Sequence, residues 1–366
     1  MPNPGSELAI VPMLQGTLHI YVAFDWGDEI PLERVRQLVP ASTHELPRRR
    51  RTPLSFSYRP APLHVPLPSA ALELAELGTV QVTVGATIFD FGAVSVAFHV
   101  PFSASHEKLL RLAGNLADAT ALIQKARDVI APLHQQLLSA IRDPLWQADL
   151  SEEYFVFQFG PEMLHHTADS AWLAGMVHLE REALSSEEIA EALRYRLSYS
   201  PDDLFVPDWA AAVLVDRECD DTLHAIDFAN LQLLEFRHID NRLDESLAAA
   251  DRIIQPLTRS RWPYFRMHDR PLRVLGELKV EANGLFERAG NVLKLVGDPY
   301  IARVYRLVAK RFHLETWIEN IQRKLEVAEG VYQVVSDQAG SFRMEFLEII
   351  VVLLIFIEIV LAFVHR

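Results

Sequence analysis

The sequence predicts an α+β head, a helical coiled-coil-like stalk and one C-terminal transmembrane helix. Three observations carry this prediction: strand-like and helical patterns alternate in the head, only helical patterns follow it, and the last segment is almost entirely apolar. Two β-α-β-α units are expected to form a mixed sheet. The expected segments are the first unit at 1–150, a second, acidic unit at 151–262, a helical hairpin or stalk at 263–345 and the membrane span at 346–364.

The first unit begins with a strand and a short helix. Residues 18–24 are apolar and aromatic, which is typical of a buried strand. Pro31 stands at the first turn of a predicted helix, and Pro40 ends that helix. The proline-interrupted chain from there to Pro68 is expected to be irregular, with one edge strand at 54–58.

A hairpin and a helical run complete the first unit. Residues 79–87 and 92–100 alternate and are rich in β-branched side chains, and the Asp-Phe-Gly sequence between them predicts a hairpin. We expect both strands in the core. Leucines and alanines recur at helical spacing over 105–140, where Pro132 is expected to kink the helix.

The second unit repeats this order of elements. The expected elements are a strand at 154–159, a helix with a capping box at 185–197, a turn and strand at 204–216 and a long helix at 222–254. Residues 89–98 and 207–215 look like counterparts, although their identity is too low to prove a duplication. The two units are expected to share one sheet or to form two small ones.

A heptad pattern marks the helical segment before the C-terminus. Apolar residues recur at alternating spacings of four and three from Leu314 to Phe346, which is the seam of a coiled coil. Two interpretations are open: a stalk that self-associates into a homo-oligomer, and an intramolecular hairpin with the amphipathic run at 272–295. Ala328 and Ala339 are small for a parallel dimer seam, and the two interpretations stay balanced.

The C-terminal segment is predicted to anchor the chain in a membrane. A helix over 346–364 rises ~1.5 Å per residue and covers about the ~30 Å hydrocarbon core of a bilayer. Because two residues follow it, we expect a tail anchor, with membrane lipid as a partner and the bulk of the chain in the cytoplasm. The acid within the span is interpreted as one that a weakly hydrophobic anchor tolerates, rather than a helix contact or ion path. The expected anchor residues are Phe346, Ile350, Leu354, Glu358 and Val364.

Composition and charge narrow the class of protein. A chain that is 50% hydrophobic and 23% charged suits a folded globular protein. Its one cysteine, Cys219, excludes an internal disulfide framework and a multi-cysteine zinc site. The net charge of −14 is concentrated at residues 151–250, and an acidic surface repels phosphate backbones. DNA is therefore not expected as a partner.

Catalytic motifs are missing from the sequence. It contains no glycine-rich phosphate loop, G-x-S-x-G or H-E-x-x-H, so no catalytic residue and no cofactor is predicted. Weak metal candidates are Glu235, His238 and Asp244; the first two have the i, i+3 spacing of di-iron bundles. A solvated acidic helix face is the favoured interpretation. The alternative function is a membrane-bound, metal-dependent hydrolase or nuclease.

Four consecutive arginines form the most distinct polar feature. Arg48, Arg49, Arg50 and Arg51 stand between two prolines. Guanidinium groups present paired donors that bind the phosphate of RNA or of a lipid head group. A solvated loop is the favoured interpretation, and lipid is slightly preferred to RNA as a ligand because an anchor is predicted.

Several segments together resemble a known family. They are residues 28–33, which follow the first strand, the hairpin at 88–98, the helical stretch at 314–348 and the apolar segment at 349–361. These patterns are similar to the required-for-meiotic-nuclear-division family of uncharacterised membrane proteins, in its bacterial form. Mitochondrial members are thought to tether ribosomes to the inner membrane. The resemblance implies a scaffold or adaptor that holds the translation machinery, or another protein partner, at a membrane.

Overall fold

The computed structural model describes most of the head and separate parts of the C-terminal region. The described residues are 13–39, 44–45, 60–146, 150–167, 169–259, 280, 283–284, 299–330, 351–352, 354–355 and 357. The chain divides into two compact units. One comprises Met1–Glu235 with Glu287–Glu315, and the other comprises Phe236–Phe286 with Thr316–Arg366.

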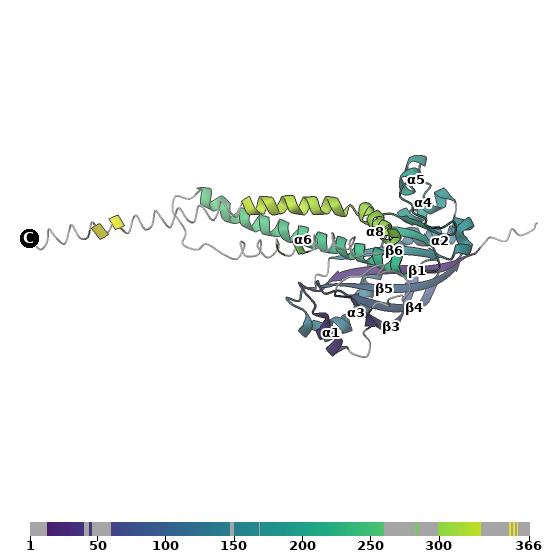
Figure 1. Cartoon of the computed structure of the whole chain (residues 1–366), viewed down its shortest axis with the longest axis horizontal. Helices are drawn as coiled ribbons and strands as arrows, with labels where there is room; N and C mark the ends of the chain where they lie inside the picture. Colours follow the sequence, from purple (N-terminus) through teal and green to yellow (C-terminus); the bar gives the residue numbers. More distant parts are fainter. Residues whose placement is uncertain are drawn as a thin grey trace, which may run out of the picture. The chain divides into compact units, whose positions relative to one another are not determined.

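The first unit is built on one mixed sheet of eight strands (Figure 1). The strands are β1 Leu14–Asp25, β2 His44–Glu45, β3 Leu63–Leu74, β4 Gly78–Ile88, β5 Ala93–Ala104, β6 Ser151–Phe159, β7 Leu204–Pro207 and β8 Ala211–Val215. Their order in the sheet is β2-β3-β4-β5-β1-β6-β8-β7. Neighbouring strands are antiparallel except β6 and β8, which are parallel. The prediction of an α+β fold with a mixed sheet is confirmed.

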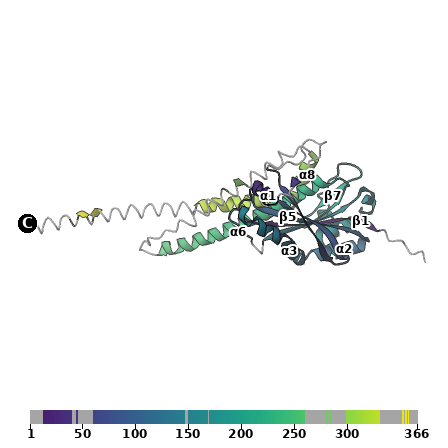
Figure 2. The same ribbon diagram turned by 90° about the horizontal axis from the view of Figure 1, so that it is seen from below.

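Helices cover both faces of this sheet. The helical elements are α1 Leu32–Leu38, α2 His106–Leu116, α3 Thr120–Leu137, η1 Leu138–Ala140, η2 Pro161–Thr167, α4 Ser170–His178, α5 Ser186–Ala192, α6 Asp220–Arg259 and α8 Pro299–Arg311. Residues 314–330 are also largely helical. Figure 2 shows α2 and α3 on one side of the sheet and α8 on the other.

Strand β1 lies in the middle of the sheet and shows how the two faces differ. Successive side chains of a strand point to opposite faces. Leu18, Ile20 and Val22 belong to the apolar core with α2, α3 and α4. His19 and Tyr21 point to the other face, which α8 and the first turns of α6 cover. One face is therefore a conventional hydrophobic core, and the other carries polar groups.

Strand β3 differs from the expectation. The prediction of an irregular segment up to Pro68 is wrong, because residues 63–74 form a strand that contains Pro66 and Pro68. The register shifts between Leu67 and Ala70, and the described part of β2 pairs with only the first two residues of β3. Proline lacks an N–H group and is tolerated at bulges and along sheet edges. The expected edge strand at 54–58 lies outside the described residues.

Helix ends agree in part with the sequence signals. The run at 105–140 is two helices that break at residues 117–119 instead of at Pro132, which lies inside α3. The cap at Ser185 is confirmed: its Oγ accepts a 3.2 Å hydrogen bond from the N–H of Glu188. Helix α5 ends at Ala192, earlier than the predicted end at residue 197. The long helix expected at 222–254 is α6.

Strand pairing differs between the two halves of the head. Strand β5, in the first half, is antiparallel to β1. Strand β8, its expected counterpart in the second half, is parallel to β6. Both halves contribute to a single sheet, so the alternative of two small sheets is wrong.

The second unit contains the later turns of α6 and the helical residues 316–330. Lys324 Nζ lies 2.7 Å from a carboxylate oxygen of both Asp240 and Asp244, so these two helical segments lie side by side. The seam residues Ile321 and Leu325 are buried within the chain. The sequence left two alternatives open, a self-associating stalk and a hairpin with residues 272–295. The described part of the seam instead pairs with α6.

The C-terminal span lies mostly outside the described residues. Within 346–364, the structure describes residues 351–352, 354–355 and 357, which are helical. In the described part of the chain, no helix is both long and apolar enough to cross a membrane. The seam positions beyond residue 330 also lie outside the described residues.

Candidate functional site

The face of the sheet under α6 contains buried polar contacts. Ser95 of β5 donates a 2.5 Å hydrogen bond from Oγ to Oδ1 of Asp227 on α6. Asn230, one helical turn later, donates from Nδ2 to the backbone oxygen of Glu152 on β6 at 3.3 Å. These bonds satisfy polar groups that would otherwise be costly to bury. They fix the position of α6 on the sheet.

Asp227 is an unusual acid because its side chain is buried. Burial raises the pKa of Asp227 to about 7, and the hydrogen bond from Ser95 opposes that shift. Burial, together with the nearby Asp227, also raises the pKa of Tyr21 well above its ordinary value. The head therefore holds a carboxyl group that takes up or releases a proton near neutral pH.

Two histidines meet between β1 and β5. His19 Nδ1 lies 2.8 Å from His99 Nδ1, and His19 Nε2 lies 2.7 Å from Oε1 of Gln158. Burial lowers the pKa of both rings, that of His99 to about 4, so both are neutral at pH 7. Since Gln158 Oε1 only accepts, His19 donates from Nε2 and accepts at Nδ1 from His99. These contacts form a chain of hydrogen bonds that runs from His99 through His19 to Gln158.

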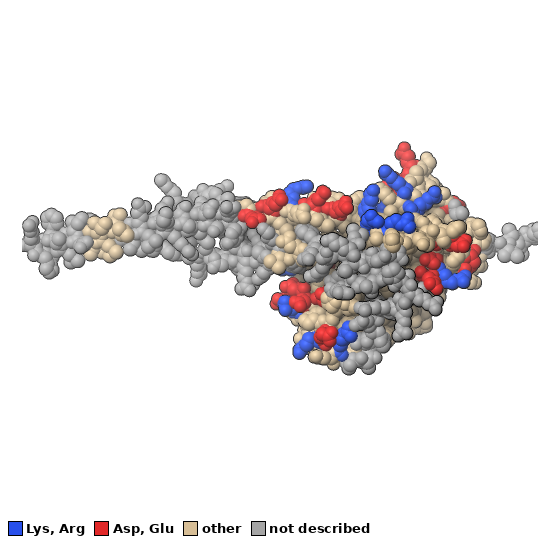
Figure 3. All heavy atoms as spheres, in the orientation of Figure 1, with Lys and Arg blue, Asp and Glu red and all other residues tan. Residues whose placement is uncertain are grey.

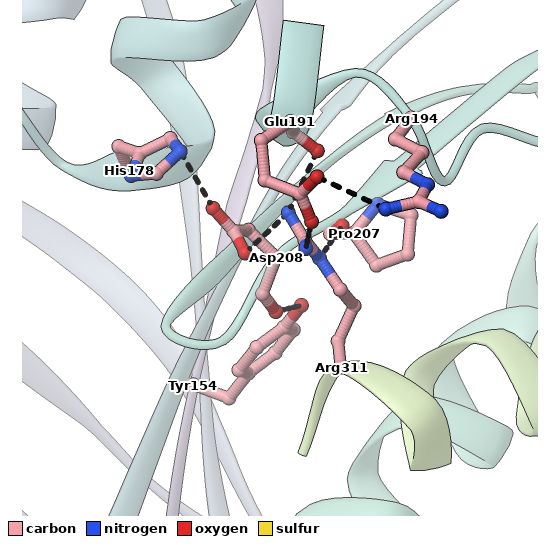
Figure 4. A network of polar contacts seen from close by, with 7 residues as sticks. All are labelled: Tyr154, His178, Glu191, Arg194, Pro207, Asp208 and Arg311. Atoms are coloured by element: carbon pink, nitrogen blue, oxygen red, sulfur yellow. Dashed lines mark hydrogen bonds and ion pairs between the residues drawn. The ribbon is translucent and has the colours of Figure 1, made fainter. Parts of the chain in front are cut away.

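A second polar network lies where the turn between β7 and β8 meets α8 (Figure 4). Oδ1 of Asp208 accepts a hydrogen bond from Arg311 Nη2 at 2.7 Å. Oδ2, the other carboxylate oxygen, lies 3.2 Å from His178 Nε2. The hydroxyl of Tyr154 donates to the backbone oxygen of Asp208 at 2.8 Å. Arg311 Nε donates to the backbone oxygen of Pro207 at 3.3 Å. Arg311 thus ties the end of α8 to the sheet.

Helix α5 extends the same network. Arg311 Nη1 lies 3.4 Å from Oε1 of Glu191, and Arg194 Nη1 lies 3.4 Å from the other carboxylate oxygen. Burial raises the pKa of Asp208, while the charges of Arg311 and then His178 oppose that shift. The cations therefore favour the ionised form of a carboxylate that is only 3% exposed. The arrangement is an ion-pair network that holds α5, α8 and the sheet together.

The weak metal candidates are in different surroundings. Glu235 and His238 are buried, and burial followed by the charge of Arg242 lowers the pKa of His238 to about 4. Asp244 is half exposed and ion-paired with Lys324. The favoured interpretation of a solvated face therefore fits Asp244 alone. Among the residues that the structure describes, no group of three or more His, Cys, Asp or Glu is arranged to hold a metal ion.

Most of the other predicted site residues lie outside the described residues. These include all four arginines of the phosphate candidate, Arg48, Arg49, Arg50 and Arg51, and the anchor residues Phe346, Ile350, Glu358 and Val364. Leu354 is described; it is helical and 58% exposed.

The Asp208 network was not found from the sequence. Tyr154, His178 and Arg311 come from β6, α4 and α8, and Asp208 lies in the turn before β8, so the four residues share no local motif. Asp208 follows Pro207 in the turn before β8, which is the position of an ordinary polar turn residue. A buried partner that lies about a hundred residues away leaves no periodic signal in a single sequence.

Comparisons with known proteins give a family. Residues 15–222 match a family model described as uncharacterised protein MJ0711, N-terminal domain. Uncharacterised protein MJ0711 from Methanocaldococcus jannaschii is 29% identical over 195 residues, which cover 52% of this chain and 58% of that protein. The match therefore spans less than two thirds of the relative's length. No solved structure matches the chain.

Proposed function

The chain belongs to the MJ0711 N-terminal domain family, and we propose that it is a membrane-anchored scaffold or adaptor. The matched region, 15–222, contains all of the sheet except its first residue, Leu14, and ends in the first turn of α6. The family is uncharacterised, so the proposal rests on features of this chain. In the proposal, the head faces the cytoplasm and the segment 346–364 holds the protein in the bilayer.

One observation carries the membrane part of the proposal. Val351, Val352, Leu354, Ile355 and Ile357 are helical, and each is at least 43% exposed. Successive residues of a helix are about 100° apart, so these side chains point in all directions around the axis. A helix that lies on a soluble protein keeps a polar face, whereas one that is apolar all round is buried in protein or lipid. The surrounding apolar sequence favours lipid.

The scaffold part of the proposal rests on the resemblance described above. The chain resembles the required-for-meiotic-nuclear-division family, whose mitochondrial members are thought to tether ribosomes to a membrane. By this analogy the head would hold the translation machinery, or another partner, near the bilayer. A self-associating stalk beyond residue 330 belongs to the same proposal, because it would set the number of heads at each anchor.

Deletion of residues 346–366 tests the anchor. We expect the full chain to stay in the membrane pellet through an alkaline carbonate wash, and the shortened chain to move to the soluble fraction, because it lacks the apolar segment. An unrelated single-span helix of equal length, fused at residue 345, should restore retention. Retention of the shortened chain through the same wash would show that another part of the protein holds the membrane and would defeat the proposal.

A further inference from the structure

Helix α8 exposes a row of positive charges. Arg303, Arg306 and Lys310 are exposed and follow one another at spacings of three and four, so they lie on one face of the helix. The helix contains no Asp or Glu. Its opposite face packs into the head through Ile301, Val304, Tyr305 and Val308. Figure 3 shows Lys and Arg side chains gathered beside α5 and α8.

These three cations have no acidic partner in the described part of the chain. Arg311, at the end of the same helix, is paired with Asp208. Arg306 instead donates from Nε to the backbone oxygen of Ala302 at 3.2 Å. A protein with a net charge of −14 has many acids with which to neutralise surface cations. A row of cations without such partners is complementary to an external anion.

Aromatic rings lie beside the row near its start. The rings of Tyr199 and Tyr300 are 5.5 Å apart, edge to face, and Arg303 lies 5.7 Å from the centre of the Tyr300 ring. Tyr199 is 76% exposed, so its other side is open to solvent. A planar ring in this position offers a stacking surface next to a guanidinium group.

A second aromatic group lies near the end of the row. Lys310 Nζ lies 4.8 Å from the centre of the Tyr195 ring. Trp209 is 64% exposed and directly follows Asp208, the partner of Arg311. Along α8, the ten steps from Tyr300 to Lys310 cover about 15 Å. Stacking surfaces therefore stand near both ends of a cationic row long enough for a few nucleotides.

We propose that this surface binds single-stranded RNA. The α8 patch consists of Arg303, Arg306, Lys310, Tyr199 and Trp209. The three cations would contact phosphates, and the two rings would stack on bases, which is how sequence-tolerant single-strand sites are built. The inference deepens the proposed function and rests on it, because it names RNA as what the anchored head holds.

The chemistry of the patch favours RNA over a lipid surface. Surfaces that bind membranes bury a large apolar face, in which aliphatic side chains such as leucine accompany the aromatic ones, below the head groups. The exposed large apolar residues of the patch are Tyr199 and Trp209, both amphipathic rings and neither aliphatic. Two of its three cations are arginines, whose planar groups both bind phosphate and stack on bases.

The binding test uses the full chain in a non-ionic detergent with fluorescein-labelled oligouridine about 15 nucleotides long. Fluorescence anisotropy would be recorded over a series of salt concentrations. In a plot of the logarithm of the binding constant against the logarithm of the salt concentration, each phosphate contact with a single strand contributes about 0.7 to the steepness of the slope. Arg303→Gln, Arg306→Gln and Lys310→Gln together should therefore make the slope shallower by about 2. Affinity at 0.1 M salt should fall roughly 100-fold. Trp209→Ala should lower the affinity for RNA roughly tenfold, because it removes a stacking contact and no charge.

A matched control removes three positive charges elsewhere. Arg34, Lys108 and Arg142 are exposed and belong to other parts of the head, and their combined replacement by glutamine should leave affinity within about twofold, because screening by salt weakens the effect of charges outside the binding surface. Equal loss in both triple variants, or no binding by the wild type, would overturn the proposal. A third outcome is that the triple variant of the patch loses affinity for the RNA while Trp209→Ala and Tyr199→Ala bind as the wild type does. That outcome would indicate a surface that binds phosphate alone, such as one for lipid head groups, and would also overturn the proposal. Membrane retention is measured separately, so failure of the anchor would be distinguished from failure of RNA binding.

Discussion

Replacing Arg311 with leucine is expected to lower the free energy of unfolding by about 3–5 kcal/mol. The substitution removes the guanidinium that pairs with Asp208. It leaves a buried carboxylate whose remaining side-chain contact in Figure 4 is the ring of His178. It also removes the hydrogen bond to the backbone oxygen of Pro207. The measurement is urea-induced unfolding followed by tryptophan fluorescence, since Trp209 adjoins the network.

Two further variants make this result specific. Arg306→Leu changes the same residue type on the exposed face of α8 and should cost less than ~0.5 kcal/mol. Asp208→Asn combined with Arg311→Leu removes the buried charge and should be more stable than Arg311→Leu alone. Equal stability of Arg306→Leu and Arg311→Leu would show that the ion pair does not hold α8 to the sheet.

Replacing Gly92 with alanine is expected to cost about 3 kcal/mol or more. Gly92 follows the turn between β4 and β5 and has φ +97°, a conformation that alanine adopts only with strain of about 1–3 kcal/mol. An added Cβ would also lie 1.6 Å from the backbone oxygen of Gly27, so the two backbone segments would have to separate. The thermal midpoint of the purified head should fall accordingly.

Gly78, at the end of the turn between β3 and β4, provides a matched control. It has φ +71°, but no atom lies within 4 Å of the position that a Cβ would take. Gly78→Ala should therefore cost about 1 kcal/mol, from backbone conformation alone. If both alanine variants lose the same stability, the contact with Gly27 is not rigid and the account of this turn is wrong.

Local signals made part of the fold predictable from the sequence. The hairpin at Gly92 and the cap at Ser185 each depend on a few neighbouring residues, and both are confirmed. The long helix α6 carries many turns of consistent spacing, which gives a strong periodic signal. Strand β3 was missed because Pro66 and Pro68 argue against a strand, and only its place near the sheet edge makes them tolerable.

The candidate sites were harder to predict, for two physical reasons. The Asp208 network joins elements that are remote in sequence, so no spacing rule reveals it. The α8 patch was hidden by averaging charge along the chain: Tyr199 and Trp209 belong to the acidic region 151–250, while Arg303 and Arg306 come from a later helix. Folding brings them to one surface, which regional net charge does not report.

The most direct test of the membrane claim is the surroundings of residue 355 in vesicles. Cys219→Ser with Ile355→Cys leaves one thiol for a nitroxide label in the full chain. If the exposed apolar helix lies in lipid, oxygen, which concentrates in hydrocarbon, should relax the label more strongly than a water-soluble nickel chelate does. The same label at Trp209→Cys should show the reverse order. Stronger relaxation by the nickel chelate at residue 355 would place this helix in water and contradict the account.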